Sequence, residues 1–189
     1  MIILKLKAGL GNQMFQYAFA KALALKYNET LKIDTSWFKH IPEKDTPREY
    51  GLKHFNICSE TCEYDESKFS IYSRKISKKI RRFFFKDSDY VFYPSVTKIN
   101  TKKVNIIEGY WNTEKYFKHI REVLKKEFTL KDTLGADASI IRSEIETISE
   151  SRHTIFVLVR RGDYVTNTHA NSFHGVIGEE YYAQAYKRI

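Results

Sequence analysis

An α/β fold built on a parallel sheet is predicted by three features of this sequence. The chain opens as strand, glycine turn, helix and strand, the first βαβ unit of a wound parallel sheet. A β-rich run at residues 104–107 is followed by Glu108-Gly109, and another at residues 154–159 runs into a turn at Gly162. Ligands of such sheets bind at the carboxyl ends of the strands. The turns after these strands are therefore the first candidates for a functional site.

The opening elements follow from periodicity and turn chemistry. Residues 2–7 alternate and are β-rich, which predicts the first strand. Asn12 follows the glycine turn and is the expected N-cap of a helix. Apolar side chains then recur at helical spacing, at Met14, Phe15, Ala18, Ala22 and Leu25. Residues 31–33 predict a second strand that ends at Asp34.

Three further helices and one long loop are expected downstream. Helical periodicity covers residues 120–128, 138–149 and 181–189, and a polar loop connects Arg160 to Gly178. Residues 68–86 are basic and contain no acid, with apolar residues on one helical face. This stretch predicts either an amphipathic helix on an anionic membrane surface or a solvated surface helix packed on the domain.

Composition and charge limit the functions that this chain can have. The chain has 189 residues, a net charge of +9 and a pI near 9.4, so one domain and the start of another fit, and an anionic partner is expected. No recognised nucleic-acid motif occurs, so nucleic acid is not the expected partner. Cys58 and Cys62 predict two reduced thiols. No secretory signal or membrane span is visible, which predicts a cytoplasmic protein.

The glycine turn after the first strand is the first candidate site. Gly9 and Gly11 let a ligand approach the backbone, and the helix behind them favours anions. Asn12 and Gln13 add two amide side chains that suit sugar hydroxyls or phosphate oxygens. Met14 stands where a dinucleotide fingerprint needs its third glycine. A purely structural turn is the alternative.

The second candidate site is the turn Arg160-Arg161-Gly162-Asp163. Guanidinium groups match phosphate oxygens and stay charged, so Arg160 and Arg161 predict a clamp for the diphosphate of an activated donor. Asp163 either orients a guanidinium or accepts a proton from an attacking hydroxyl. The alternative is an ion pair between Arg160 and Asp163 that only closes the loop.

Metal chemistry is not expected from this sequence. His169 and His174 lie in the loop beyond, without Cys or Glu at ligand spacing. His174 is a candidate ligand contact, and the alternative is a solvated loop histidine. No acidic pair suits a nucleotide-bound cation, so the paired arginines take that role.

Several long strings together resemble the α-1,2-fucosyltransferases of glycosyltransferase family 11. They span most of the chain outside residues 44–100, and the longest are GLGNQMFQYAFAKALA at residues 9–24 and VRRGDYV at residues 159–165. The others are Glu108-Gly109-Tyr110-Trp111, Glu114-Lys115-Tyr116-Phe117, Phe173-His174-Gly175 and Tyr181-Tyr182.

The resemblance implies a glycosyltransferase-B fold of two Rossmann-like halves. Residues 1–152 would form the acceptor-side domain, and residues 153–189 would begin the domain that binds GDP-fucose. Such enzymes move L-fucose from GDP-fucose to a galactose 2-hydroxyl with inversion and without a metal. By the same resemblance Arg160 binds the β-phosphate of the donor and Asn12 is functionally sensitive. The general base is not identified.

Two departures from the family pattern qualify this expectation. Leu158 occupies the position of a family histidine. Members of the family also continue beyond the point that corresponds to Ile189, so this chain alone is expected to be inactive. The alternatives are a truncated, inactive remnant and a basic module that binds anions or nucleic acid.

Overall fold

The computed structural model describes residues 1–43, 45–64, 99, 101–102, 104–132, 135–155, 157–159 and 161–188. These residues divide into two compact units. The first contains Met1–His40 and Arg48–Asp132, and the second contains Ile41–Pro47 and Thr133–Ile189. The expected basic helix at residues 68–86 lies outside the described residues, and the predicted domain boundary after residue 152 stays a prediction.

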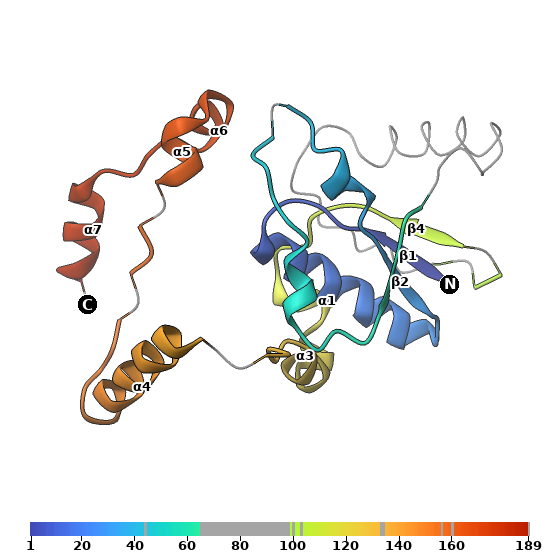
Figure 1. Ribbon diagram of the computed structural model, residues 1–189, viewed down its shortest axis with the longest axis horizontal. Coiled ribbons are helices and arrows are strands. Elements are labelled where there is room, and N and C mark those ends of the chain that lie inside the picture. Colours follow the sequence, from blue (N-terminus) through green and yellow to red (C-terminus); the bar gives the residue numbers. More distant parts are fainter. Residues whose placement is uncertain are drawn as a thin grey trace. The chain divides into compact units, whose positions relative to one another are not determined.

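A four-stranded parallel sheet forms the centre of the first unit (Figure 1). Its strands are β1 (Ile2–Lys5), β2 (Leu31–Asp34), β3 (Glu60–Cys62) and β4 (Asn105–Ile107), in the order β3-β2-β1-β4. The predicted parallel α/β architecture is therefore confirmed. Strand β3 was not predicted; its three residues pair with β2 in parallel register.

Successive side chains along β1 point to opposite faces of the sheet. Ile2, Leu4 and Leu6 are fully buried in the core, where helix α1 (Leu10–Tyr27) covers them. Lys5 and Lys7 alternate with this set and therefore lie on the face opposite α1. Burial of an aliphatic side chain contributes about 1.5–3 kcal/mol, so the register of β1 is strongly fixed.

Helix α1 begins three residues earlier than a cap at Asn12 would allow. Gly9 is the N-cap, with extended backbone at φ −73° and ψ 166°, and it has no capping side chain. The Gln13 N–H donates to the Gly9 carbonyl at 3.0 Å, so the first turn has already formed at Asn12. The prediction of Asn12 as N-cap is wrong, and its side chain is not needed to start the helix.

The segments after β2 and β4 pack around α1 and complete the first unit. Trp111 stacks on Phe19 with ring centroids 4.1 Å apart. The buried Tyr17 hydroxyl donates to Glu127 at 2.6 Å, and the Lys21 ammonium donates to the same carboxylate at 2.6 Å. Burial and this hydrogen bond raise the pKa of Tyr17. The short elements here are 3-10 helices η1 (Ser36–Lys39), η2 (Gly51–His54), η4 (Glu114–Tyr116) and η5 (Lys118–Ile120), and helix α3 (Arg121–Glu127).

Gln13 fastens the loop that follows β2 to the start of α1. Its side chain is fully buried. Its Nε2 donates to the carbonyls of Ala8 and Glu49, both at 2.8 Å, and its Oε1 accepts from the Gly51 N–H at 2.9 Å. Both amide hydrogens and the amide oxygen are thus satisfied by backbone groups.

Gln16 lies three residues further along α1 and holds the backbone that connects β1 to α1. It is also fully buried. Its Oε1 accepts from the Lys7 N–H at 3.1 Å and its Nε2 donates to the Lys7 carbonyl at 3.3 Å. Ala8, between Lys7 and Gly9, has φ 68°, a left-handed conformation that costs a residue with a Cβ about 1–2 kcal/mol. The two glutamines hold this strained backbone in place.

The second unit is helical in the part that the structure describes. Its helices are α4 (Ala136–Ser151), α5 (Gly162–Thr166), α6 (Thr168–His174) and α7 (Glu179–Tyr186). The polar loop expected between Arg160 and Gly178 is therefore wrong, because it contains α5 and α6. Helix α6 was not predicted, although Asn167 is a residue type that starts helices. Its Oδ1 accepts from the His169 N–H at 3.0 Å and caps the start of α6.

The strand expected at residues 154–159 is also wrong. Its described residues pair with no strand, and Val157 and Leu158 are 58% and 69% exposed. A parallel strand needs neighbours on its edges and covering layers on its faces. The described part of the second unit supplies neither neighbouring strands nor covering layers. These β-rich residues therefore have no strand to pair with.

Among the described residues, we find no helix that combines the length and the hydrophobicity needed to span a lipid bilayer.

We predict that Gln13→Leu destabilises the protein by about 1–3 kcal/mol, because part-buried backbone groups of Ala8, Glu49 and Gly51 lose their partner and a group left unsatisfied away from water costs about that much. Urea unfolding followed by circular dichroism measures this loss. The matched control is Gln184→Leu on the exposed surface of α7, for which we expect a change within about 0.5 kcal/mol. Equal stability of the two variants would contradict the fastening role of Gln13.

Candidate functional site

The carboxyl ends of the parallel strands bring several chain segments to one edge of the sheet. Lys7 and the glycine turn follow β1, Asp34 closes β2, and Glu108 follows β4 directly. This edge is where open α/β sheets bind ligands. It contains Gly9, Gly11, Asn12 and Gln13, the first set of predicted site residues.

Asn12 differs from the two glutamines that follow it in α1. Gln13 and Gln16 are fully buried with their amides bonded to backbone. Asn12 is half-buried, and its side chain makes no hydrogen bond within the part of the chain that the structure describes. Asn12 therefore offers a ligand both its N–H groups and its oxygen, whereas Gln13 belongs to the scaffold of the turn.

The two glycines of the turn have different surroundings. A methyl group at Gly9 would lie 3.7 Å from Nε of Arg48, in ordinary contact, whereas one at Gly11 would meet no atom within 4 Å. Packing therefore does not require glycine at position 11, and the backbone there is open to an approaching molecule. Arg48 was not predicted, because no local pattern shows that the loop after β2 returns to the turn.

Asp34, Glu63 and Glu108 end or follow described strands at this edge of the sheet, and their surroundings differ. Asp34 is 1% exposed, and its Oδ1 accepts from the Ser36 N–H at 3.0 Å and the Tyr64 N–H at 3.2 Å. Glu63, just after the outer strand β3, pairs with Lys39 on the open surface. The Glu108 side chain is 33% exposed beside the central strand.

Glu108 is held by both lysines of the sheet face opposite α1. Its Oε1 lies 3.2 Å from Lys7 Nζ and its Oε2 lies 3.8 Å from Lys5 Nζ. The Lys7 ammonium also lies 5.1 Å from the centre of the Tyr110 ring. Sequence reasoning missed Glu108 as a site residue, although its place directly after a strand was a usable signal.

The thiol at this edge is not activated. Cys62 ends β3, and burial together with the nearby Asp34 carboxylate raises its pKa. A raised pKa keeps the thiol protonated and a poor nucleophile. Cys58 and Cys62 are both free, which agrees with the expectation of two reduced thiols.

The arginine turn belongs to the second unit and is described in part. Arg160 and the side chain of Asp163 lie outside the described residues, so the proposed ion pair between them stays untested. Arg161 is exposed, and its guanidinium has no bonded partner in the described part of the chain. Its carbonyl accepts from the Tyr164 N–H at 2.7 Å and so begins α5.

His174 is engaged with a neighbouring ring. It stacks on Tyr164 with centroids 4.5 Å apart and an angle of 8° between the planes. The Asn171 side chain donates to the Tyr164 carbonyl at 2.6 Å. This packing joins α5 to α6 and gives His174 a structural partner beside its predicted ligand contact. Within the described ranges, no three His, Cys, Asp or Glu side chains are grouped as metal ligands.

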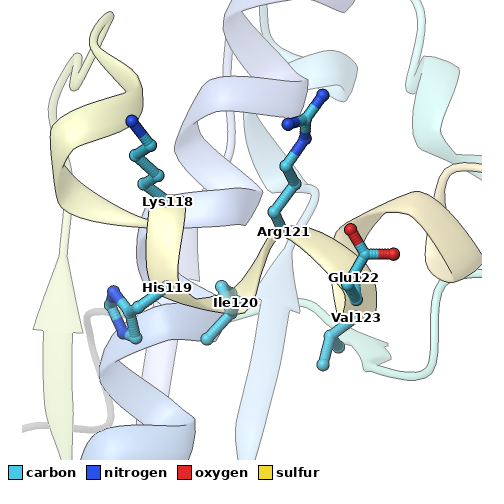
Figure 2. A pocket seen from close by; sticks show the side chains of 6 residues that line it. All are labelled: Lys118, His119, Ile120, Arg121, Glu122 and Val123. Atoms are coloured by element: carbon cyan, nitrogen blue, oxygen red, sulfur yellow. The ribbon is translucent and has the colours of Figure 1, made fainter.

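A surface hollow of about 310 Å³ lies on η5 and α3 (Figure 2). All six lining residues are consecutive, Lys118–Val123, and in Figure 2 the charged ends of Lys118 and Arg121 extend away from Ile120 and Val123. No strand end and no residue of the glycine turn reaches it. The chemistry at the sheet edge therefore does not involve this hollow.

Comparison with known proteins identifies relatives along the whole chain. The O-antigen biosynthesis glycosyltransferase WbnK of Escherichia coli is 28% identical over 97% of this chain and 66% of its own length. The alpha-1,2-colitosyltransferase of Escherichia coli is 29% identical over 100% of this chain and 63% of its own length. The galactoside alpha-(1,2)-fucosyltransferase 1 of Rattus norvegicus is 38% identical over 36% of this chain and 19% of its own length.

The chain thus spans just under two thirds of the length of its two bacterial relatives. No solved structure matches it. The profile of Glycosyl transferase family 11 matches residues 64–189, which include the arginine turn. This match covers more than half of the sequence and confirms the resemblance that the motifs indicated: the chain belongs to glycosyltransferase family 11.

Proposed function

We propose that this protein is an inverting α-1,2-fucosyltransferase that moves L-fucose from GDP-fucose to the 2-hydroxyl of a galactoside. The observation that carries the proposal is family membership together with two relatives whose names specify α-1,2 transfer. One of these relatives acts on a galactoside by its name. The open turn at Gly11 and Asn12 supplies a place at the sheet edge where a sugar or phosphate fits.

The reaction in this proposal is a direct displacement at the anomeric carbon of the donor. The acceptor oxygen forms the new bond, and the bond from the anomeric carbon to the diphosphate breaks with its electron pair leaving on GDP. Arg160 stabilises that developing charge and Arg161 supports it. Such preorganised electrostatic contacts often provide the largest catalytic contribution. Asp163 orients a guanidinium, and His174 borders the ligand.

The proposed fold around this site is glycosyltransferase-B, with the acceptor on the first Rossmann-like domain and the donor on the second. The parallel sheet and α1 support the first domain. We place the reaction in the cytoplasm, with the basic stretch at residues 68–86 in contact with an anionic membrane surface. The products would be fucosylated surface glycans.

Transfer of colitose is a second candidate. The colitosyltransferase relative aligns with the whole chain, whereas the named fucosyltransferase aligns with about a third of it. Both names specify the same α-1,2 linkage, so the two candidates differ in the donor alone. Incubation of a chain lengthened to the full size of the bacterial relatives with GDP-fucose or GDP-colitose and a β-galactoside, followed by mass spectrometry and NMR of the product, distinguishes them. Transfer of neither sugar, or a different linkage, would refute the proposal.

We predict that Arg160→Ala lowers turnover by about 100-fold or more, because a charge-assisted contact to the leaving diphosphate is lost. The variant is measured in a chain lengthened to the full size of the bacterial relatives. Arg152→Ala, at the exposed end of α4, is the matched control and should keep its turnover. Normal turnover and GDP affinity in Arg160→Ala would remove this arginine from the site.

We also predict that transfer continues in excess EDTA at an unchanged rate. Arginine side chains supply the positive charge that a divalent cation gives to other transferases. The initial rate is compared before and after chelation and after addition of Mg²⁺ or Mn²⁺. A strict requirement for either metal would contradict the proposed role of the arginine turn.

A further inference from the structure

Glu108 is a carboxylate at the ligand-binding edge of the sheet that an outside molecule can reach. It follows β4 directly, and β4 pairs with the central strand β1 in parallel register, with Leu4 opposite Ile107. Continuing this register places Glu108 beside Lys5, in agreement with the 3.8 Å ion pair between them. Its carboxylate therefore lies on the face opposite α1, next to the strand that leads into the glycine turn.

Three other carboxylates of the first unit differ from Glu108 in their burial, bonding or position. Asp34 is buried and accepts two backbone N–H groups. Glu127 is 5% exposed and bonded by Tyr17 and Lys21. Glu63 follows β3, two strand positions from β1, which leads into the glycine turn; this corresponds to roughly 10 Å at the usual strand spacing.

The groups around Glu108 fix its carboxylate and provide a surface for a sugar ring. Lys5 and Lys7 hold one carboxylate oxygen each, at 3.8 and 3.2 Å. A carboxylate has about four lone-pair positions, so each oxygen keeps the capacity to accept a hydroxyl hydrogen. The half-buried Tyr110 ring beside Lys7 adds an aromatic surface with a polar tip, which suits a ligand that is part apolar and part hydroxylated.

Resting on the proposed function, we propose that Glu108 binds the acceptor hydroxyl that attacks the donor and takes its proton. The hydroxyl oxygen bonds to the anomeric carbon of the nucleoside-diphosphate sugar while its proton moves to a Glu108 oxygen. The bond from the anomeric carbon to the diphosphate breaks, and its electron pair leaves with the nucleotide. Glu108 is thereby the catalytic base that the sequence patterns did not identify.

The binding half of this inference is tested on the 189-residue chain. Saturation-transfer NMR compares a β-galactoside with its 2-deoxy analogue. Loss of a hydrogen bond to a charged group weakens binding by roughly tenfold or more, so the wild-type chain should prefer the 2-hydroxyl compound by that factor. Glu108→Leu should bind the two compounds equally. Glu63→Leu, which also leaves a lysine without its glutamate, should keep the wild-type preference.

The chemical half is tested with Glu108→Gln in the lengthened chain. Removal of a general base lowers transfer to the galactoside by roughly 10²–10⁴-fold. Azide has no proton to give, so formation of the glycosyl azide should stay within about threefold of wild type. Thermal unfolding confirms that each variant is folded.

The outcomes separate this inference from the proposed function. A wild-type chain that binds no galactoside overturns both the Glu108 subsite and the proposed acceptor. Galactoside binding whose 2-hydroxyl preference survives in Glu108→Leu overturns the subsite alone. Equal loss of galactoside and azide transfer in Glu108→Gln overturns its role as base.

Discussion

The hydrogen bonds of Gln13 and Gln16 to the backbone around the first turn are the constraint on which the site depends. They hold Ala8 at φ 68° and fasten the loop at Glu49 and Gly51 to the start of α1. Without them, part-buried backbone groups would lose their partners, and each group left unsatisfied away from water would cost about 1–3 kcal/mol. The fixed turn then leaves the backbone at Gly11 open.

The same edge of the sheet shows how similar side chains take different roles through their surroundings. Two buried amides belong to the scaffold, whereas the amide of Asn12 has no partner in the described part of the chain. Asp34 is buried and bonded to backbone, whereas Glu108 is partly exposed between two lysines. Burial and bonding therefore select Asn12 and Glu108 as the groups that a ligand can engage.

Much of the first unit followed from the sequence, because periodicity and glycine turns are local signals. The strands at residues 2–7, 31–34 and 104–107 and the helix after the glycine turn are present, with small shifts of their ends. The role of Gln13 could not be predicted, since its partners Glu49 and Gly51 are distant in sequence. The strand at residues 154–159 failed for a related reason: β-rich residues form a strand only where neighbouring strands pair with them. Family membership followed from long strings whose residues serve both packing, as at Trp111, and the site.

The most direct test of this account compares Asn12→Ala with wild type in thermal unfolding and in transfer to a β-galactoside, using the lengthened chain. An amide free for a ligand predicts unchanged stability, within about 0.5 kcal/mol, together with transfer lowered by roughly tenfold or more. Unchanged transfer, or a loss of stability as large as that of Gln13→Leu, would show that Asn12 belongs to the scaffold and would contradict the account.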